Sequence, residues 1–275
     1  AAGRSVGRQP GPADGVALPP AANTPLRAPE LPARHSAEVT LDLDRLRQAG
    51  HLVPALARSG LAEEFRNIKR PLLKNAQEAT PPGAHPRSLI MVSSALPGEG
   101  KTFCSINLAM SIAMEVDSSV LLVDADVVRP ALFARLGLSN ERKGLLDILT
   151  EPDLDMSEVL LKTNVPKLSL LGTGTLNAKS TELLASVAMG QLLEELAARY
   201  PDRIVIFDAP PLLLTTEARV LASHVGQVVM VIEASNTALR DVKQAFAAIE
   251  KCPIVLSVLN KCRDPFEKSA YGYYY

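Results

Sequence analysis

A glycine-rich loop joins an apolar run to a helical segment near residue 100. Residues 88–94 read as a short buried strand, and residues 101–114 read as a helix. Between them, residues 95–102 are Ala-Leu-Pro-Gly-Glu-Gly-Lys-Thr. This matches the phosphate-loop pattern G-x-x-x-x-G-K-[ST], except that Ala95 stands at the first glycine. The order of strand, loop and helix predicts a phosphate site at the carboxyl end of a parallel strand.

Each part of this loop has a chemical reason. Gly98 and Gly100 lack a Cβ, so the backbone can curl and point its N–H groups inward. Lys101 would reach the β- and γ-phosphates of ATP, and the Thr102 hydroxyl would bind Mg²⁺. The alternative is a plain glycine-rich turn, which the Gly-Lys-Thr ending in this context disfavours. The residues predicted to contact nucleotide are Pro97, Gly98, Glu99, Gly100, Lys101, Thr102 and Phe103.

Three carboxylates follow two further apolar runs. Asp124 and Asp126 come directly after residues 121–123, and Asp208 comes directly after residues 204–207. An acid at the end of a buried strand lies at the rim of the sheet, near the phosphate loop. We expect Thr102, Asp126 and Asp208 to serve magnesium. For a lone aspartate the alternative is a capping or turn role, and the combination with the loop disfavours it.

Short apolar runs alternate with helical segments over most of the chain. This alternation predicts an α/β fold that is P-loop NTPase-like, with a mainly parallel β-sheet flanked by helices on both faces. The predicted strands are 88–94, 120–123, 168–171, 203–207, 228–232 and 254–259, and the predicted helices are 60–75, 101–114, 191–199 and 238–251.

Composition divides the chain into four parts. Residues 1–36 are rich in Pro and Ala and predict a disordered arm, either a linker or a partner-binding tail. Residues 37–84 form an N-terminal segment whose start is compatible with a strand or a helix. Residues 85–262 form the predicted ATP-binding domain. Residues 263–275 form a tyrosine-rich tail.

Charge and cysteine content exclude several classes of protein. The 29 basic and 30 acidic residues give a net charge of −1, so we expect no nucleic-acid partner. The three cysteines fit neither a zinc motif nor a disulfide framework. No apolar run approaches the roughly 20 residues that span a bilayer. We therefore expect a cytoplasmic protein that reaches a membrane only through a partner.

Tyrosine is distributed unevenly. Four of the five tyrosines lie within the last five positions of the sequence: Tyr271, Tyr273, Tyr274 and Tyr275. No core requires such a cluster at a chain end, where segments are commonly mobile. Together with an ATP site, the cluster predicts phosphoacceptors. A tail that packs on a partner or on the surface is the alternative.

The loop at 93–102, the segments 121–130 and 204–211, and the tyrosine cluster resemble the bacterial tyrosine kinases (BY-kinases). The resemblance covers about residues 60–275 and is greatest to the stand-alone autokinases of exopolysaccharide loci that carry exosortase systems. It implies that Lys101, Asp124 and Asp126 are catalytic. Asp124 would take the tyrosine proton, while Asp126 and Asp208 would serve magnesium.

The same resemblance implies partners. Glu63, Arg66 and Lys69 fall on the family's E-x-x-R-x-x-R segment, which packs subunits into a ring, and their spacing places them on one helix face. A solvated face is the alternative. The resemblance also implies a homo-oligomer, a membrane polysaccharide co-polymerase that activates the kinase, a phosphotyrosine phosphatase, and a location peripheral to the inner membrane.

Three positions depart from the family pattern. Lys69 stands where an arginine is usual and cannot form the bidentate fork of arginine. Val128 stands where a basic residue is usual, and Arg129 follows it. Ala95 replaces the loop's first small residue.

Two other functions share these motifs. A positioning or partitioning ATPase, acting as a nucleotide-switched binding module, would have the same fold and the same paired acids. Such proteins carry a signature lysine where this chain has Leu96, and they lack a tyrosine tail. A scaffold that binds ATP without turnover is a third possibility, which the complete set of acids and Lys101 disfavours.

Overall fold

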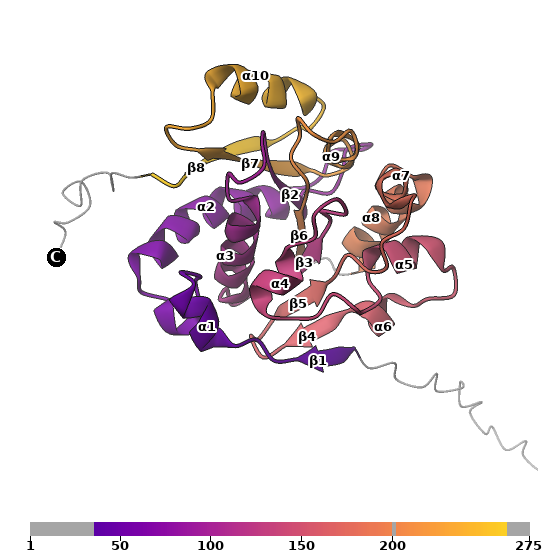
Figure 1. Ribbon diagram of the computed structural model, residues 1–275, viewed down its shortest axis with the longest axis horizontal. Coiled ribbons are helices and arrows are strands. Elements are labelled where there is room, and N and C mark those ends of the chain that lie inside the picture. Colours follow the sequence, from indigo (N-terminus) through magenta and orange to yellow (C-terminus); the bar gives the residue numbers. More distant parts are fainter. Residues whose placement is uncertain (1–35, 200–201, 263–275) are drawn as a thin grey trace, which may run out of the picture. The chain divides into compact units, whose positions relative to one another are not determined.

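The computed structural model describes residues 36–199 and 202–262, and its centre is an eight-stranded sheet (Figure 1). The strand order is β1-β4-β5-β3-β6-β2-β7-β8. All neighbouring strands run parallel except β4 and β5. The strands are β1 (Ala37–Val39), β2 (Leu89–Ser94), β3 (Ser119–Asp124), β4 (Leu161–Thr163), β5 (Leu168–Leu171), β6 (Arg203–Asp208), β7 (Gln227–Glu233) and β8 (Val255–Asn260).

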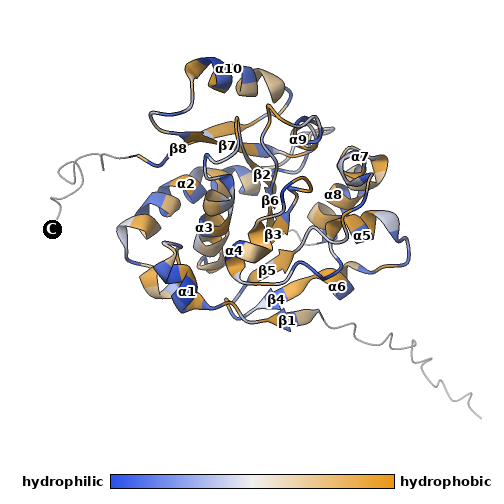
Figure 2. Ribbon diagram, in the orientation of Figure 1, coloured by the Kyte–Doolittle hydropathy of each residue, from blue (hydrophilic) through white to orange (hydrophobic). Residues whose placement is uncertain are grey.

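The central strands are buried on both faces because helices cover both sides of the sheet. Successive side chains of a strand point to opposite faces. In β2, Leu89 and Met91 join one hydrophobic core, whereas Ile90 and Val92 join the other. This explains why the central strands are continuous apolar runs without polar alternation, and Figure 2 shows them as an apolar centre.

The helices form two layers. On one face α1, α2, α3 and α4 enclose the core that contains Ile90, and on the other α5 to α10 enclose the core that contains Leu89. The helices are α1 (Leu43–Gln48), α2 (Gly60–Gln77), α3 (Lys101–Ala113), α4 (Leu132–Leu136), α5 (Leu145–Thr150), α6 (Met156–Val159), α7 (Ser180–Leu184), α8 (Val187–Arg199), α9 (Glu217–Ala222) and α10 (Leu239–Ala248), with a 3₁₀ turn at Pro54–Leu56.

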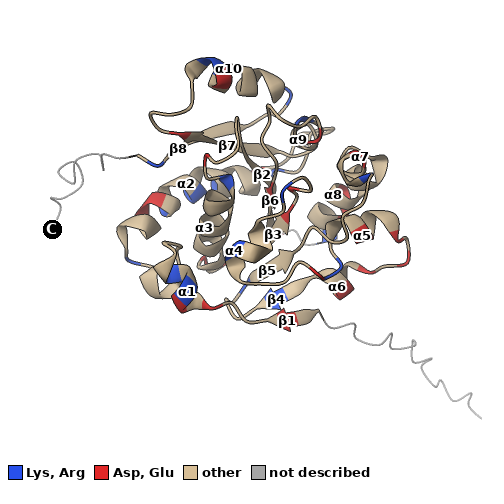
Figure 3. Cartoon of the chain, viewed as in Figure 1, with Lys and Arg blue, Asp and Glu red and all other residues tan. Residues whose placement is uncertain are grey.

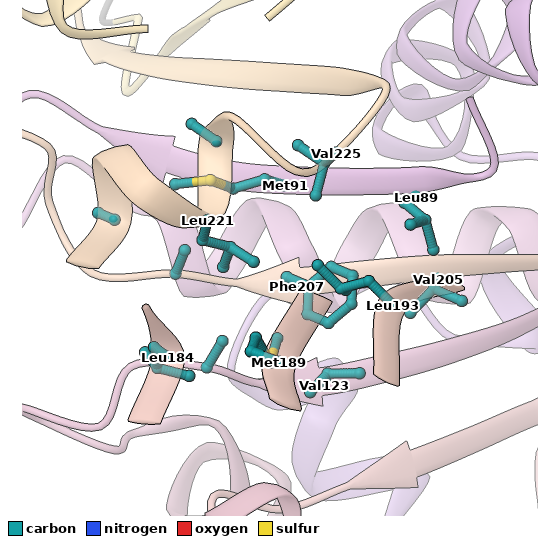
Figure 4. Packing of buried hydrophobic residues seen from close by; sticks show 14 of the residues in the cluster. Leu89, Met91, Val123, Leu184, Met189, Leu193, Val205, Phe207, Leu221 and Val225 are labelled. Carbon is teal, nitrogen blue, oxygen red and sulfur yellow. The ribbon is translucent and has the colours of Figure 1, made fainter. Parts of the chain in front are cut away.

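Figure 4 shows how the second core is packed. Phe207 of β6 lies between Met91 of β2 and the helical residues Met189 and Leu193. These side chains are at most 2% exposed. Burying each one contributes about 1.5–3 kcal/mol, so this layer fixes β6 and β2 beside each other. The loops that follow these two strands are thereby held together at one edge of the sheet.

The N-terminal segment belongs to the same folded unit. β1 pairs with β4, and the Asp42 side chain caps α1 by accepting the N–H of Arg45 at 2.9 Å. Ser59 caps α2 in the same way, with its hydroxyl accepting the N–H of Ala62. α2 then packs against α3, the helix that starts at the phosphate loop. Residues 37–77 therefore contribute to one of the two cores.

Every strand and helix predicted from the sequence is present, with ends that differ by a few residues. The predictions left open whether the segment that begins at residue 37 starts as a strand or a helix, and the structure has both, β1 and then α1. They omitted β4 and the other helices of four to six residues, whose periodicity is too short to recognise. The arm at 1–35 and the tail at 263–275 lie outside the described residues. Within the part of the chain that the structure describes, no helix has the length and apolarity needed to cross a bilayer.

Candidate active site

The loop and the acids meet at the carboxyl edge of three neighbouring strands. β6 lies between β2 and β3, with Asp208 opposite Asp124 on one side and opposite Val92 on the other. The loop 95–100 leaves β2 at the same edge and leads directly into α3. The predicted juxtaposition of the phosphate loop with the paired acids is therefore present in the structure.

The two loop glycines adopt backbone angles that other residues rarely adopt. Gly98 has φ +88° and Gly100 has φ +99°. A Cβ on Gly100 would also lie 2.0 Å from Asn260 Nδ2, so the Asn260 side chain would have to move. The glycines are required by this geometry, and they leave the N-terminal end of α3 open for an anion.

Side chains at the end of β8 and in the turn between β7 and α10 hold the loop from outside. Asn260 Nδ2 donates to the Glu99 carbonyl at 2.8 Å, and Lys261 Nζ donates to the Gly98 carbonyl at 2.7 Å. The buried Glu99 carboxylate accepts the Leu96 N–H at 2.7 Å and the Thr237 hydroxyl. The side chain of Glu99 therefore shapes the loop, while its carbonyl is held by Asn260.

Lys101 turns toward the acids. Its Nζ lies 2.7 Å from Asp126 Oδ2 and 4.0 Å from Asp208 Oδ1. Burial by itself would lower the pKa of Lys101, but the charges of Asp208 and Asp126 outweigh it and the pKa is raised. Lys101 therefore stays protonated, as a phosphate-binding cation must.

Asp208 is fully buried beside this lysine. Burial is the largest cause of a raised pKa, which Lys101 and the hydroxyls of Thr102 and Ser105 partly oppose. Its Oδ1 accepts a hydrogen bond from the Ser105 hydroxyl at 3.1 Å. Its Oδ2 has no hydrogen-bond partner among the described residues. A buried carboxylate oxygen without a partner is costly alone and fits a cation, so these residues suit Mg²⁺.

Asp124 lies behind Asp126. Its carboxylate accepts the N–H of Asp126 at 3.3 Å and the N–H of Leu132 at 3.2 Å. Burial first, and then the nearby Asp208, raise the pKa of Asp124 to about 8. Asp126 also accepts the N–H of Arg129 at 2.9 Å, so the two acids fold the segment that follows β3.

A cleft of about 520 Å³ opens in front of the loop. Of the predicted site residues it is lined by Asp126 and by every loop residue from 97 to 103 except Glu99. Asp124 and Asp208 lie deeper than its walls. Phe103 closes one side, with its ring centroid 5.1 Å from that of His51. The walls also include Val128, Arg129, Pro210 and Leu214. The sequence analysis had noted Val128 and Arg129 only as departures from the family pattern, not as residues of the cleft.

The three residues of the predicted ring segment do not share one face of α2. Glu63 is exposed and pairs with the partly exposed Arg66, which also donates to the Ala57 carbonyl at 3.1 Å. Lys69 is only 4% exposed. Its Nζ donates to the Ser111 carbonyl at 2.6 Å and pairs with Glu115 at 2.7 Å. A spacing of three falls short of a full helical turn each time, so the third residue rotates toward α3.

Some residues of the site could not be recognised in the sequence. Ser105 lies one turn after the loop lysine, where serine is also an ordinary helix residue. Asn260 ends β8 and Lys261 follows it, more than 150 positions after the loop. Their only signal is a polar pair at the end of a predicted strand. The predicted phosphoacceptor tyrosines lie outside the described residues.

Comparison with known proteins decides the family. A family model described as an AAA domain matches residues 87–257, which is more than half of the chain. The tyrosine-protein kinase YwqD of Bacillus subtilis is 32% identical over 186 residues, covering 67% of this chain and 76% of YwqD. This chain belongs to the bacterial tyrosine kinases.

Other members of the family differ in length. The putative tyrosine-protein kinase EpsB of Ralstonia nicotianae is 32% identical over 187 residues, yet the chain spans only 24% of EpsB. The kinase domain of the Escherichia coli tyrosine kinase ETK has the same fold, with a TM-score of 0.62 at 24% identity, covering 88% of this chain and 94% of the ETK domain. The α/β, P-loop NTPase-like fold predicted from the sequence is thereby confirmed.

Proposed function

We propose that this chain is an ATP-dependent protein-tyrosine autokinase that phosphorylates Tyr271, Tyr273, Tyr274 and Tyr275. The observation that carries the proposal is the Lys101–Asp126 pair at 2.7 Å at the phosphate loop, beside Asp208, one oxygen of which has no hydrogen-bond partner in the part of the chain that the structure describes. Family membership supports tyrosine as the acceptor. The tyrosine-rich segment supplies acceptors within the same chain.

Thr102, Asp126 and Asp208 are the residues proposed to hold Mg²⁺. A bound magnesium ion would neutralise phosphate charge and orient the terminal phosphoryl group. Lys101 is released from Asp126 when phosphate oxygens compete for its Nζ. The loop glycines and the first turn of α3 provide N–H groups for the remaining phosphate oxygens.

The transfer itself requires little covalent chemistry from the protein. The tyrosine hydroxyl oxygen attacks the terminal phosphorus, the bond to ADP breaks, and the hydroxyl proton passes to a carboxylate. We assign that carboxylate to Asp124, as the family resemblance implies. Because Asp124 lies behind Asp126, the acceptor hydroxyl must enter the cleft past Asp126.

The cellular role follows from the family. We propose that the kinase regulates the synthesis and export of an exopolysaccharide or capsule. Its partners would be a membrane polysaccharide co-polymerase, whose cytoplasmic tail activates it, and a phosphotyrosine phosphatase. This arrangement would hold the kinase at the inner membrane through its partner. The exposed Glu63 and the partly exposed Arg66 of α2 are the residues proposed to contribute to a homo-oligomeric ring.

Phosphotyrosine formation tests the proposal. Purified wild-type chain and Lys101→Met are incubated with ATP and Mg²⁺, with and without the cytoplasmic tail of the co-polymerase, and probed for phosphotyrosine. We expect a signal in the wild type and a loss of at least about 100-fold in Lys101→Met. Nucleotide-dependent dimerisation without phosphotyrosine under both conditions would instead support a positioning ATPase.

A further inference from the structure

Two histidines lie side by side at the amino edge of the sheet, opposite the phosphate loop. His85 stands in the segment that precedes β2, and His224 stands between α9 and β7. β2 and β7 are parallel neighbours, so their amino ends bring the two residues together. The ring centroids of His85 and His224 are 5.6 Å apart, with the rings tilted by 45°. The proposed kinase reaction uses neither histidine.

Backbone packing holds the two histidines in this position. Pro86 follows His85, and Gly226 lies two positions after His224. A Cβ on Gly226 would lie 2.5 Å from the Pro86 carbonyl oxygen and 2.6 Å from Arg87 Cα, so glycine is required for the two segments to lie this close. The positions of the histidines are therefore set before any ligand binds, which lowers the entropy cost of binding.

Hydrogen bonding determines which nitrogen of His224 can bind a metal ion. Its Nδ1 lies 2.8 Å from the Val220 carbonyl oxygen, which can only accept a hydrogen bond, so Nδ1 carries a proton. In the neutral ring, Nε2 then has a free lone pair. Metal-binding histidines commonly have this arrangement, with the second nitrogen donating to a carbonyl. The side chain of His85 forms no hydrogen bond with any residue of 36–199 and 202–262, so its nitrogens are available as well.

A small cavity lies between the histidines and helix α8. Its volume is about 20 Å³, and its walls include His85, His224, Gly190 and Glu194. A Cβ on Gly190 would lie 4.0 Å from Nε2 of His224, so the free nitrogen is on the side of α8. Glu194 follows Gly190 by about one helical turn and lies on the same face of α8. A cavity of this size holds one ion or water molecule.

These groups suit a transition-metal ion better than Mg²⁺. Imidazole nitrogen is a preferred ligand of Zn²⁺, Ni²⁺ and Cu²⁺, whereas Mg²⁺ prefers oxygen. Two imidazoles that share an ion at about 2.1 Å have ring centres roughly 5–6 Å apart, which the observed 5.6 Å matches. Within the described part of the chain, no group of three or more His, Cys, Asp or Glu side chains is arranged around one metal position. A site here therefore has two protein ligands, and water completes the coordination.

Local ligands, rather than overall charge, must select the ion. The net charge of the chain is only −1, and Figure 3 shows acidic and basic residues distributed over helices on both faces of the sheet. Such a surface attracts cations weakly. Recognition therefore depends on the two imidazoles and on the carboxylate of Glu194, which forms no ion pair with a basic residue among those described.

We propose that His85 and His224 form a binding site for one divalent metal ion of the class that prefers imidazole, with Glu194 contacting the ion through water. The site is independent of the proposed kinase reaction. A bound ion links the segment before β2 to the turn between α9 and β7. Because the unfolded chain does not hold the two histidines together, binding stabilises the fold.

Titration of the full chain with zinc chloride tests the site. Calorimetry is performed with Mg²⁺ in excess, so that sites built from carboxylates are already occupied. We expect one Zn²⁺ to bind per chain, and the melting temperature to rise by about 5 °C or more when the free ion is at a hundredfold excess over Kd. His85→Gln and His224→Gln should each weaken binding at least tenfold, and Glu194→Gln by a smaller factor.

Three control variants distinguish this site from other groups that bind metals. Cys262→Ser removes the exposed thiol, and His35→Gln removes another histidine. Asp126→Asn removes a carboxylate of the candidate active site. All three should keep the Kd for Zn²⁺ within twofold of the wild-type value.

A fourth variant blocks the cavity and leaves both histidines in place. Gly190→Leu fills the space in front of His224 Nε2 and should weaken Zn²⁺ binding at least tenfold. Urea unfolding without metal shows whether each variant is folded. Absence of Zn²⁺ binding by the wild type would overturn the site, and so would wild-type affinity in both histidine variants. Phosphotyrosine formation is not part of this assay, so the metal site and the proposed kinase function can fail separately.

Discussion

At the scale of single residues, the main feature of the site is one largely buried lysine whose charge is shared by two buried carboxylates. Lys101 is shared between Asp126 and Asp208, and one oxygen of Asp208 has no hydrogen-bond partner among residues 36–199 and 202–262. Such an arrangement is costly by itself, because a buried carboxylate needs a compensating cation. The cost is offset when a metal ion and phosphates bind, so ligand binding and stability should be strongly linked.

Changing each of the three acids to asparagine should affect either nucleotide binding or phosphate transfer, depending on the acid. Asp126→Asn and Asp208→Asn should lose the Mg²⁺-dependent part of nucleotide affinity, since each removes a proposed metal ligand. Asp124→Asn should bind nucleotide and Mg²⁺ nearly as well as the wild type but transfer phosphate about 100-fold more slowly or worse. Titration with a fluorescent ATP analogue, beside a phosphotyrosine assay, distinguishes the two classes. If Asp126→Asn kept Mg²⁺-dependent binding, its role as a metal ligand would be refuted.

The raised pKa of Asp124 also predicts a pH dependence. Between its ordinary pKa and its folded pKa of about 8, the folded protein holds a proton that the unfolded chain has lost. Stability must therefore fall as pH rises through this window, by up to about 1.4 kcal/mol per pH unit. Thermal melts of the metal-free protein at pH 7 and pH 8.5 should show this fall, and Asp124→Asn should reduce it. A melting temperature that rises over this range in the wild type would contradict the assignment.

Local patterns allowed the principal residues of the site to be predicted. The Gly-Lys-Thr ending and an acid directly after an apolar run are each readable within ten residues. Ser105, Thr237 and Asn260 were not predicted, because they act through contacts that only the folded chain creates. The side-chain contact of Glu99 with Thr237 could not be anticipated for the same reason.

At the scale of elements, the loop is held between α3 and the end of β8. Gly100 combines a left-handed backbone with a close approach to Asn260. Side chains that only strain the backbone cost about 1–3 kcal/mol, whereas a Cβ on Gly100 would also push the Asn260 amide away from the Glu99 carbonyl that it holds. The effect of backbone strain can therefore be distinguished from damage to the phosphate site by comparing glycines with and without this contact.

Gly100→Ala should lower nucleotide affinity at least tenfold and destabilise the fold by about 2 kcal/mol. Gly83→Ala provides the matched control, since Gly83 has φ +79° but open space where a Cβ would stand. It should cost about 1 kcal/mol and leave nucleotide affinity unchanged. Calorimetric binding and urea unfolding of both variants make the comparison, and equal nucleotide affinities would show that Asn260 does not constrain the loop.

Helix α2 carries two separable roles. Lys69 satisfies the Ser111 carbonyl near the end of α3 and is buried there. Lys69→Met should therefore destabilise the protein by about 1–3 kcal/mol, while the exposed Lys74→Met should change stability by less than about 0.5 kcal/mol. Urea unfolding measures both, and equal effects would contradict the structural role of Lys69.

The exposed residues of α2 should affect assembly instead. The double change Glu63→Ala and Arg66→Ala removes a surface pair and should leave stability within about 1 kcal/mol of the wild type. It should shift the oligomer toward the monomer in light-scattering measurements. An unchanged oligomer would remove α2 from the proposed ring contact.

Elements differed in how well they could be predicted. Long buried strands and α2 were recognised, because apolar runs and spacings of three and four are strong signals. β1 and β4 have three residues each and several helices have only four to six, so tertiary packing defines them more than their own sequence does. The shared face expected for Glu63, Arg66 and Lys69 failed at Lys69, because the direction of packing decides which side of a helix is buried.

At the scale of the whole molecule, strand order creates the site. β2, β6 and β3 are adjacent although they are far apart in the chain. β3 and β6 end in Asp124 and Asp208, and β2 leads into the phosphate loop. The α/β class and the ligand edge were predictable from alternation alone. The antiparallel β4 and the addition of β1 beside it were not, because pairing between distant short strands leaves no local pattern.

The intact mass of the full chain after incubation with ATP and Mg²⁺ tests the central claim most directly. Three proteins are compared: the wild type, Lys101→Met, and a variant with Tyr271, Tyr273, Tyr274 and Tyr275 changed to Phe. The activating cytoplasmic tail is added in a parallel set. We predict successive additions of about 80 Da, one per phosphate, in the wild type only. Equal additions in the Phe variant, or none in the wild type with and without the activator, would contradict the account of an autokinase that modifies its own tyrosine cluster.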